Sequence, residues 1–175
     1  FIGLEQEQYD SLTAIAPTIA QPGDFPSFGA PWQLMARNIG AATGHSAAAE
    51  ALIADVEGRF AAIRAAHPEF EGIELAYAGA YGADAPIFYV ETNGSTRMRV
   101  LQDLGFVVPA ELDALGTDHF YHDISSEQLD LLDQDVVLWE PAVHELLGVI
   151  QANALYQTLG VHTQQRDIFI QDPLI

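Results

Sequence analysis

The feature that most constrains the fold is a helical pattern from Trp32 to His67, which Gly40 and Gly44 interrupt once. Ser46 is a suitable N-cap for the second part. The helix ends at His67 because a residue before proline avoids helical backbone angles. About 20 residues rising about 1.5 Å each form a rod of roughly 30 Å, which is long for a domain of this size. Apolar residues recur on one face of this rod and predict a buried stripe: Leu52, Ile53, Val56, Phe60 and Ile63.

Beyond the rod the pattern changes to alternating strands and helices. Strands are predicted over 72–80, 87–91, 135–140 and 166–172, and helices over 96–106, 125–134 and 142–159. This alternation is typical of an α/β fold with a mostly parallel sheet flanked by helices. Residues 21–31 hold three prolines and two glycines and predict an extended connector. We therefore expect three parts: residues 1–30, the long helical segment 31–67, and an α/β lobe over 68–175.

The charge balance excludes several functions. All six basic residues are arginines, and 25 acidic residues give a net charge of -19. Nucleic acids and anionic membrane surfaces are unsuitable partners for so acidic a chain. No apolar run is long enough to span a membrane, and residues 1–10 have no signal-peptide pattern. The absence of cysteine excludes disulfides and thiolate metal sites.

Two arginines stand at the most informative point of this acidic sequence. Arg97 and Arg99 follow the strand that ends near Glu91 and a Gly-Ser-Thr turn, at the start of a helix. In open α/β sheets, ligands bind at the carboxyl edge of the strands, where helix N-termini attract anions. Arginine adds bidentate donors for carboxylate or phenolate oxygens. The alternative is a solvated helical turn in which the arginines pair with Glu91 or Asp103.

The segment "DHFYHD" (118–123) is the second candidate site. His119 and His122 are metal-ligand types, but positions three apart on a strand face opposite sides, so a shared metal such as zinc needs a loop there. Contact of Tyr121 or of one histidine with a ligand is the simpler interpretation. The alternative without a binding role is a short strand that carries its histidines at the edges.

Other aromatic residues complete the predicted ligand site. They are Trp32 after the connector, Tyr81 at the end of the first strand, and Trp139 at the end of an apolar strand. For Trp139 a place in the core is the alternative. No nucleophile elbow, P-loop, dinucleotide fingerprint or H-E-x-x-H motif occurs. The sequence therefore favours a binding protein over a small α/β enzyme, which is the competing interpretation.

Five segments in order carry a resemblance to a known family. They are "LEQEQYDSLTAIAPTIA", "PWQLMARNIGAATGHSAAAEALIADVEGRFAAIRAAHPEF", "RVLQDLGFVVP", "ISSEQLDLLDQDVVLWE" and "RDIFI". With them the chain resembles the class III periplasmic binding proteins, specifically the siderophore-binding components of iron ABC importers. The resemblance runs from about residue 3 to residue 175. It implies a two-lobed protein of which this chain holds the end of the first lobe, the inter-lobe helix and the C-terminal lobe. Most of the N-terminal lobe and the last helices are then expected outside the chain.

The resemblance also implies a function and roles for particular residues. It implies capture of a ferric siderophore, without cofactor or catalysis, and delivery to a membrane permease, with cobalamin, haem or a bare metal ion as alternative ligands. Arg97, or failing that Arg99, matches the turn from which relatives hold the ligand. Glu127 matches an acid that docks on the permease. An extracytoplasmic location, with lipid anchoring as one form of it, follows from the same resemblance.

Overall fold

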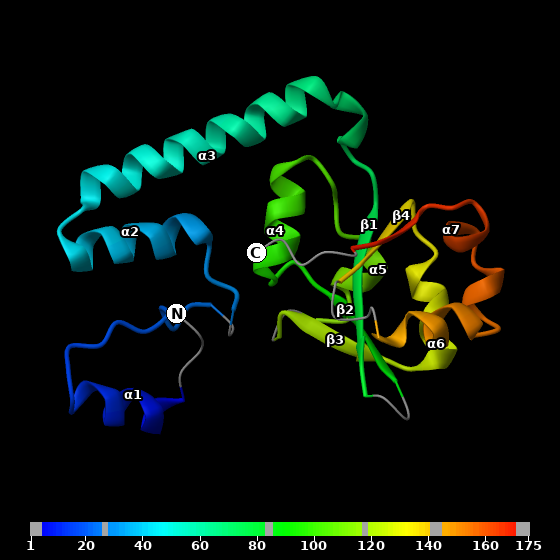
Figure 1. Ribbon diagram of the computed structural model, residues 1–175, viewed down its shortest axis with the longest axis horizontal. Helices are drawn as coiled ribbons and strands as arrows, with labels where there is room; N and C mark the ends of the chain where they lie inside the picture. Colours follow the sequence, from blue (N-terminus) through cyan, green and yellow to red (C-terminus); the bar gives the residue numbers. More distant parts are fainter. Residues whose placement is uncertain (1–4, 26–27, 83–85, 117–118, 141–144, 171–175) are drawn as a thin grey trace.

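The computed structural model describes residues 5–25, 28–82, 86–116, 119–140 and 145–170. The helices and strands follow one another as α1 (Gln6–Thr13), α2 (Trp32–Thr43), α3 (Ser46–Ala66), η1 (Pro68–Phe70), β1 (Leu75–Tyr81), β2 (Ile87–Glu91), α4 (Thr96–Asp103), α5 (Ala110–Asp113), β3 (Tyr121–Ile124), η2 (Ser126–Leu132), β4 (Val136–Trp139), α6 (Leu147–Ala152), η4 (Tyr156–Thr158), α7 (Gly160–Thr163) and β5 (Asp167–Phe169). In Figure 1 the sheet and its helices lie on one side, α1 and α2 on the other, and α3 extends across both.

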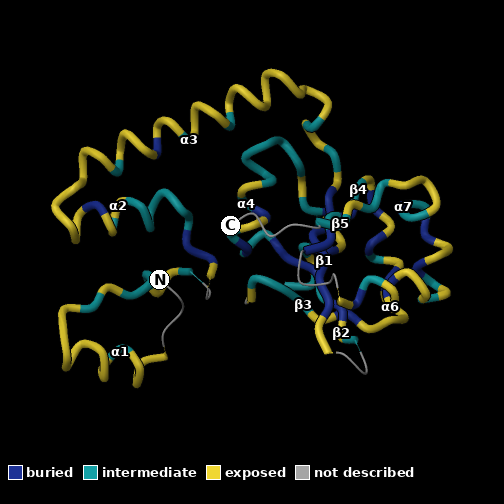
Figure 2. The backbone as a smooth tube through the Cα atoms, viewed as in Figure 1, coloured by how far each residue is buried: buried dark blue, intermediate teal, exposed yellow. Residues whose placement is uncertain are grey.

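The predicted rod is present as α3, and the predicted break separates it from α2. Gly44 ends α2 with a left-handed backbone (φ 73°), a conformation that glycine adopts without a steric penalty. Arg37 on α2 pairs with Glu50 on α3 at 2.8 Å. The predicted buried stripe is mostly wrong: of its members only Ile53 is buried, and Leu52 and Ile63 are exposed. The reason is that α3 packs along α2 and stands away from the sheet (Figure 2).

The five strands form one sheet in the order β3-β2-β1-β4-β5. The α/β class is confirmed, but the sheet is mixed rather than mostly parallel. Strands β4 and β5 run parallel to β1, whereas β1–β2 and β2–β3 are antiparallel. The physical reason is the short link between β1 and β2, because a parallel crossover needs roughly a dozen residues or more.

The helical prediction over 142–159 is only partly right. Residues 141–144 lie outside the described part of the chain, and α6 ends at Ala152, with Asn153 as its C-cap. The Asn153 side chain accepts hydrogen bonds from the backbone N–H groups of Leu155 and Tyr156 at 2.9 and 3.1 Å. A side chain that bonds the backbone locally competes with helix continuation, so the chain turns into η4 there.

The two faces of the sheet have different surroundings because successive side chains of a strand point to opposite sides. On one face, Ala76, Ala78 and Ala80 of β1 join the main core, which also contains Trp139, Leu129 and other buried residues of the following elements. On the other face, Leu75 and Tyr77 pack with Met98 of α4. We call this second face the tyrosine face, since Tyr77, Tyr81, Tyr89 and Tyr121 share it.

Candidate functional site

The strand register places four tyrosines and three carboxylates on the tyrosine face. Gly79 lies opposite Tyr89, Tyr89 opposite Asp123, and Glu91 opposite Tyr121. Directly opposed residues of antiparallel strands share a face of the sheet. Glu140 follows β4, where its backbone N–H donates to the carbonyl of Ala78 at 3.0 Å. The tyrosine face therefore gathers polar groups from four strands.

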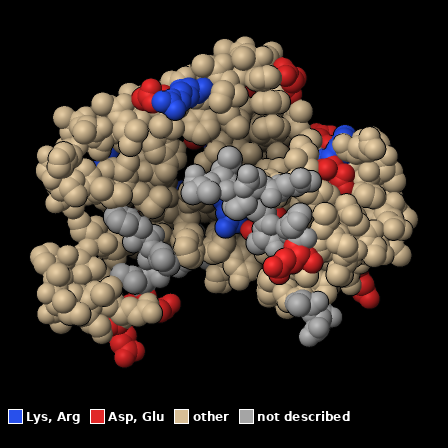
Figure 3. Space-filling model, in the orientation of Figure 1, with Lys and Arg blue, Asp and Glu red and all other residues tan. Residues whose placement is uncertain are grey.

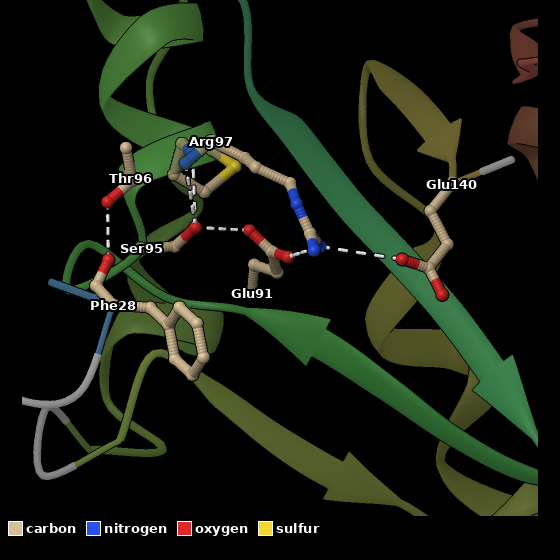
Figure 4. Close-up of polar contacts among 7 residues, drawn as sticks. Phe28, Glu91, Ser95, Thr96, Arg97 and Glu140 are labelled. Atoms are coloured by element: carbon tan, nitrogen blue, oxygen red, sulfur yellow. Dashed lines mark hydrogen bonds and ion pairs between the residues drawn. The ribbon is translucent and has the colours of Figure 1, made fainter. Parts of the chain in front are cut away.

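Arg97 lies at the centre of this arrangement. It belongs to the first turn of α4 and reaches over the Tyr77 ring, with its guanidinium 5.6 Å from the ring centroid. Its terminal nitrogen pairs with Glu91 and lies 3.4 Å from Glu140 (Figure 4). The Glu91 side chain is wholly buried, whereas 51% of the Arg97 side chain is exposed. Arg97 therefore bridges two acids while about half of its side chain stays exposed.

Ser95 connects the helix start to the same cluster. As the N-cap of α4 it accepts hydrogen bonds from the backbone N–H groups of Arg97 and Met98, at 3.1 and 3.3 Å. Its hydroxyl also donates to Glu91. Serine is among the best N-caps because its oxygen satisfies backbone donors that have no partner within the helix. The cap thus fixes Arg97 and Glu91 relative to one another.

Burial shifts the acid–base behaviour of this cluster. Burial raises the pKa of Glu91, and Glu140 raises it further, although Ser95 and Arg97 oppose the shift. Burial lowers the pKa of Arg97, but Glu91, Tyr77 and Glu140 more than compensate, so its pKa lies above the usual value. Burial likewise raises the pKa of Tyr77 to about 12. The arginine remains charged and the tyrosine remains a neutral hydrogen-bond donor at neutral pH.

Gly79 makes room for Tyr89 on this face. A Cβ atom at position 79 would lie 2.2 Å from the Tyr89 ring, closer than any real contact. The ring therefore crosses β1 where that strand has no side chain. Burial and a hydrogen bond to Glu140 raise the pKa of Tyr89. Tyr89 and Arg97 together hold Glu140 at the edge of the site.

A pocket of about 370 Å³ opens beside Arg97. It is lined by Phe28 of the connector, Met35 of α2 and five residues of the α/β lobe: Glu91, Ser95, Thr96, Arg97 and Phe120. Two aromatic rings, Phe28 and Phe120, meet edge to face in its wall with centroids 5.2 Å apart. The pocket is thus apolar on the connector side and polar on the sheet side.

Two side chains of α4 donate hydrogen bonds to backbone carbonyls of the connector. Thr96 donates to the carbonyl of Phe28, and Arg99 donates to the carbonyl of Gly29. Arg99 also lies over the Phe25 ring, 5.7 Å from its centroid. Phe28 has a left-handed backbone (φ 61°), which is strained for a bulky residue. These contacts hold that conformation at the pocket wall.

A row of aromatic rings continues from the pocket across the tyrosine face. Neighbouring centroids lie 5.2 Å apart for Phe28–Phe120, 4.8 Å for Phe120–Tyr121, 5.3 Å for Tyr121–Tyr89 and 6.2 Å for Tyr89–Tyr81. A second pocket of about 380 Å³ lies at the far end of this row. It is lined by Ala80, Tyr81, Gly82, Tyr89, Glu140, Glu145 and Leu146. Tyr89 and Glu140 thus lie between the second pocket and Arg97.

Arg97, Tyr81 and Tyr121 of the predicted ligand site lie on the tyrosine face. Arg97 lines the first pocket, Tyr81 lines the second, and Tyr121 belongs to the row of rings between them. Tyr81 lies at the end of β1 and donates to Asp123 at 3.0 Å. The alternative that Arg97 pairs with Glu91 is confirmed as a contact, while half of its side chain stays exposed.

Trp139 is not available to a ligand in this structure, so its prediction as a ligand contact is corrected here. It is fully buried, donates to the Tyr156 hydroxyl at 2.9 Å and stacks on Phe169. The physical reason is strand alternation: Trp139 points into the core, and the next residue, Glu140, points to the tyrosine face.

Three further predicted residues lie away from the pocket wall. Arg99 faces the connector, as described above, and Trp32 begins α2 one turn before Met35. Glu127 is exposed in the first turn of η2.

The histidines of the "DHFYHD" segment are separated as strand alternation requires. Asp118 lies outside the described residues. His119 is exposed, and its carbonyl accepts a hydrogen bond from Thr92. His122 pairs with Val90 on the opposite face to Tyr121. Within the described ranges no three His, Cys, Asp or Glu residues are grouped as metal ligands. The segment contributes Phe120 and Tyr121 to the candidate site, and the structure gives the zinc alternative no support.

Glu140, Tyr77, Tyr89 and Phe28 are site residues that the sequence reasoning missed. A signal for the strand residues was present: Tyr77 and Gly79 alternate along β1, and Tyr89 and Glu91 along β2. That alternation becomes informative only with the strand order and register. Phe28 has no such signal, because it reaches the site through a connector without regular structure.

Comparison with known proteins identifies the family of this chain. The family model described as periplasmic binding protein matches residues 1–168, so the chain belongs to that family, as its motifs predicted. The sequence matches no curated protein. No helix in the described part of the chain has the length and apolarity needed to cross a membrane.

Solved structures show the same fold. An iron uptake ABC transporter substrate-binding protein, PiaA from Streptococcus pneumoniae, is 25% identical with a TM-score of 0.80 over 98% of this chain and 59% of its own. A periplasmic solute binding protein from Mycobacterium smegmatis is 26% identical, with a TM-score of 0.73 over 96% and 55%. FhuD from Vibrio cholerae, solved with iron-loaded Desferal, is 19% identical, with a TM-score of 0.72 over 94% and 62%. The chain therefore spans less than two thirds of the length of these relatives.

Proposed function

We propose that this chain forms the C-terminal lobe and inter-lobe helix of an extracytoplasmic substrate-binding protein that captures a ferric siderophore. The observation that carries the proposal is the pocket between the connector and the tyrosine face, with Arg97 and Phe120 in its wall. The chain has the fold of PiaA, which has also been solved with ferrichrome. The long helix α3 then joins the lobes, and residues 1–30 belong to the end of the first lobe.

The chemistry of the pocket suits a metal chelate wrapped in organic arms. Aromatic rings give apolar contact area, while the exposed part of the Arg97 side chain can donate hydrogen bonds to ligand oxygens. A chelate brings its own metal ligands, so the site needs no protein side chains at the iron. Binding without catalysis also agrees with the family, whose relatives above are substrate-binding transport proteins.

Calorimetric titration of the full-length gene product with ferrichrome tests this function. We expect a dissociation constant below about 1 µM, which corresponds to about -8.2 kcal/mol. Tyr121→Ala is expected to weaken binding at least about tenfold, because it removes the ring between Phe120 and Tyr89. Cobalamin, haem and zinc serve as comparison ligands. Tight binding of one of these, with no binding of any ferric chelate, would reject the siderophore proposal.

Delivery to a permease is a separate part of the proposal. Glu127 is exposed at the start of η2, where a charged side chain can meet a partner protein. We expect Glu127→Arg to leave chelate binding unchanged and to reduce uptake of iron-loaded chelate in cells. Unchanged uptake would remove Glu127 from the permease contact without affecting the binding function.

A further inference from the structure

The charges around the pocket are uneven. Among the described residues of the tyrosine face, the acids Glu91, Asp123 and Glu140 share the site with one guanidinium, that of Arg97. Glu145 adds a carboxylate to the second pocket, which Glu140 also lines. Arg99, the neighbouring cation, is directed to the carbonyl of Gly29 and lines neither pocket. The site is therefore negative although its most prominent side chain is an arginine.

The arginine is neutralised from within the protein. Glu91 has a wholly buried side chain and accepts from both Arg97 and Ser95. An anionic ligand that drew Arg97 away from Glu91 would leave Glu91 buried with only Ser95 as partner. A ligand at the exposed part of Arg97 would meet a guanidinium whose charge Glu91 already neutralises. Leaving a buried charge without its ion-pair partner is strongly unfavourable. Glu140, held by Tyr89, would remain beside any such ligand.

We propose that Glu91 and Glu140 select the charge class of the chelate, so that the site takes a neutral or cationic ferric trihydroxamate and rejects an anionic ferric catecholate. Three singly charged hydroxamates neutralise iron(III), and an ammonium on a ligand arm makes the complex cationic. Three doubly charged catecholates leave the complex trianionic. This inference rests on the proposed function and specifies which ferric chelates that function covers.

The surroundings of the site also favour a neutral or cationic chelate over an anionic one. The other polar side chains described on the strands of the tyrosine face are phenols, which add no positive charge. Those of Tyr81 and Tyr89 already bond to Asp123 and Glu140. A cationic arm finds aromatic faces and carboxylates together in the second pocket, a combination that attracts ammonium groups. The net charge of -19 on the whole chain repels an anionic complex further. Acidic atoms predominate among the charged atoms on the surface seen in Figure 3.

The test compares three probes on the full-length gene product by calorimetry at low salt. The probes are ferrichrome (neutral), ferrioxamine B (cationic) and ferric enterobactin (a trianionic tricatecholate). We expect the two hydroxamates to bind at least about a hundredfold more tightly than the catecholate, a difference of about 2.8 kcal/mol. Added salt should weaken ferrioxamine B binding and strengthen any enterobactin binding, because it screens both attraction and repulsion.

Glu140→Gln separates charge selection from a structural role. Removing this carboxylate should tighten ferric enterobactin about tenfold and weaken ferrioxamine B several-fold, with a smaller change for ferrichrome than for either, in the order of their charges. A purely structural effect would change all three affinities in the same direction. Asp130→Asn is the matched control, because it removes one exposed carboxylate of η2 that lines neither pocket.

The outcomes distinguish this inference from the function on which it rests. Tightest binding of ferric enterobactin, or equal shifts of all three probes in Glu140→Gln, would overturn charge selection while the siderophore function stands. Binding of none of the three chelates would overturn the proposed function, and charge selection with it.

Discussion

The two faces of the central sheet are built from the same strands but serve opposite purposes. On the core face, the small alanines of β1 leave room for Trp139, which is fully buried among Phe88, Tyr156 and Phe169. On the tyrosine face, Tyr89 and Glu91 surround a half-exposed arginine. Neighbouring residues of a strand belong to different faces, as Trp139 and Glu140 show. Residues that stabilise the core and residues of the candidate site therefore alternate along the sequence but lie on opposite sides of the sheet.

Both faces also contain a polar network, and the two networks differ in how far their side chains are exposed to solvent. Behind the core face, Tyr156 donates to Asp167 at 2.7 Å, and His162 lies 2.6 Å from the same carboxylate. Trp139 completes that network with a bond to Tyr156. On the tyrosine face about half of the Arg97 side chain stays exposed, in the wall of a pocket. The comparison teaches that a buried polar network does not by itself identify a site, whereas a half-exposed charged donor in a pocket wall indicates one.

The largest expected effect comes from truncating one aromatic residue on each face. Trp139→Ala should reduce the free energy of unfolding by about 3–5 kcal/mol, because it leaves a cavity in the core. Tyr121→Ala should cost about 1 kcal/mol or less, since it is only partly buried. Urea denaturation measures both values, and calorimetry measures ferrichrome binding. The folded Trp139→Ala protein should keep its affinity. Equal destabilisation by the two variants would contradict the division between faces.

The second expected effect concerns the ion pair on the tyrosine face. Arg97→Met should destabilise the protein by roughly 2–3 kcal/mol, because Glu91 is left buried without its cation. Adding Glu91→Gln to that variant should restore most of the loss. A double-mutant cycle in urea measures this coupling. Additive effects of the two changes would mean that the pair contributes nothing beyond its separate side chains.

A smaller effect is expected where the Tyr89 ring of β2 lies against Gly79 of β1. Gly79→Ala should cost about 1–3 kcal/mol and weaken chelate binding, because the new methyl group displaces the Tyr89 ring. Gly58→Ala on α3 is the matched control, since a Cβ there meets nothing within 4 Å. It should stabilise the helix by about 0.5–1 kcal/mol. Thermal denaturation distinguishes the two, and stabilisation by Gly79→Ala would show that the ring moves freely.

The smallest expected effect is a pH dependence carried by Glu91. Burial raises its pKa in the folded protein above the ordinary value of 4.5, so the folded state holds this proton at pH values where the unfolded state has lost it. Stability from this group is therefore fully present below pH 4.5 and falls as the pH rises towards the folded pKa. The difference in unfolding free energy between the wild type and Glu91→Gln should show this slope. A difference that rises with pH would contradict it.

Much of the fold could be predicted because hydrophobic periodicity and turn residues act locally. The bounds of β2 and the break between α2 and α3 follow from Gly, Ser and Pro positions and match the structure. The direction of β2 was missed, because a general pattern of alternating elements was given more weight than the shortness of the link after β1. Arg97 was found from its place after a strand. Glu140 was not, because its partners come from β2 and α4, and only the assembled register brings them together.

The hydrogen bonds that attach the connector to α4 have a consequence for the thermodynamics of binding. Phe28 is held in a strained backbone conformation by contacts with Thr96 and Phe120, and Gly29 is held by Arg99. All of these contacts are between residues of the chain itself, so folding orders this wall of the pocket. Ordering a free aromatic side chain at a binding site costs about 0.5–1.5 kcal/mol, and here that entropy has been lost during folding instead. The free energy of binding is then reduced little by conformational entropy, and affinity depends mainly on how well the ligand fits a wall that is already in place.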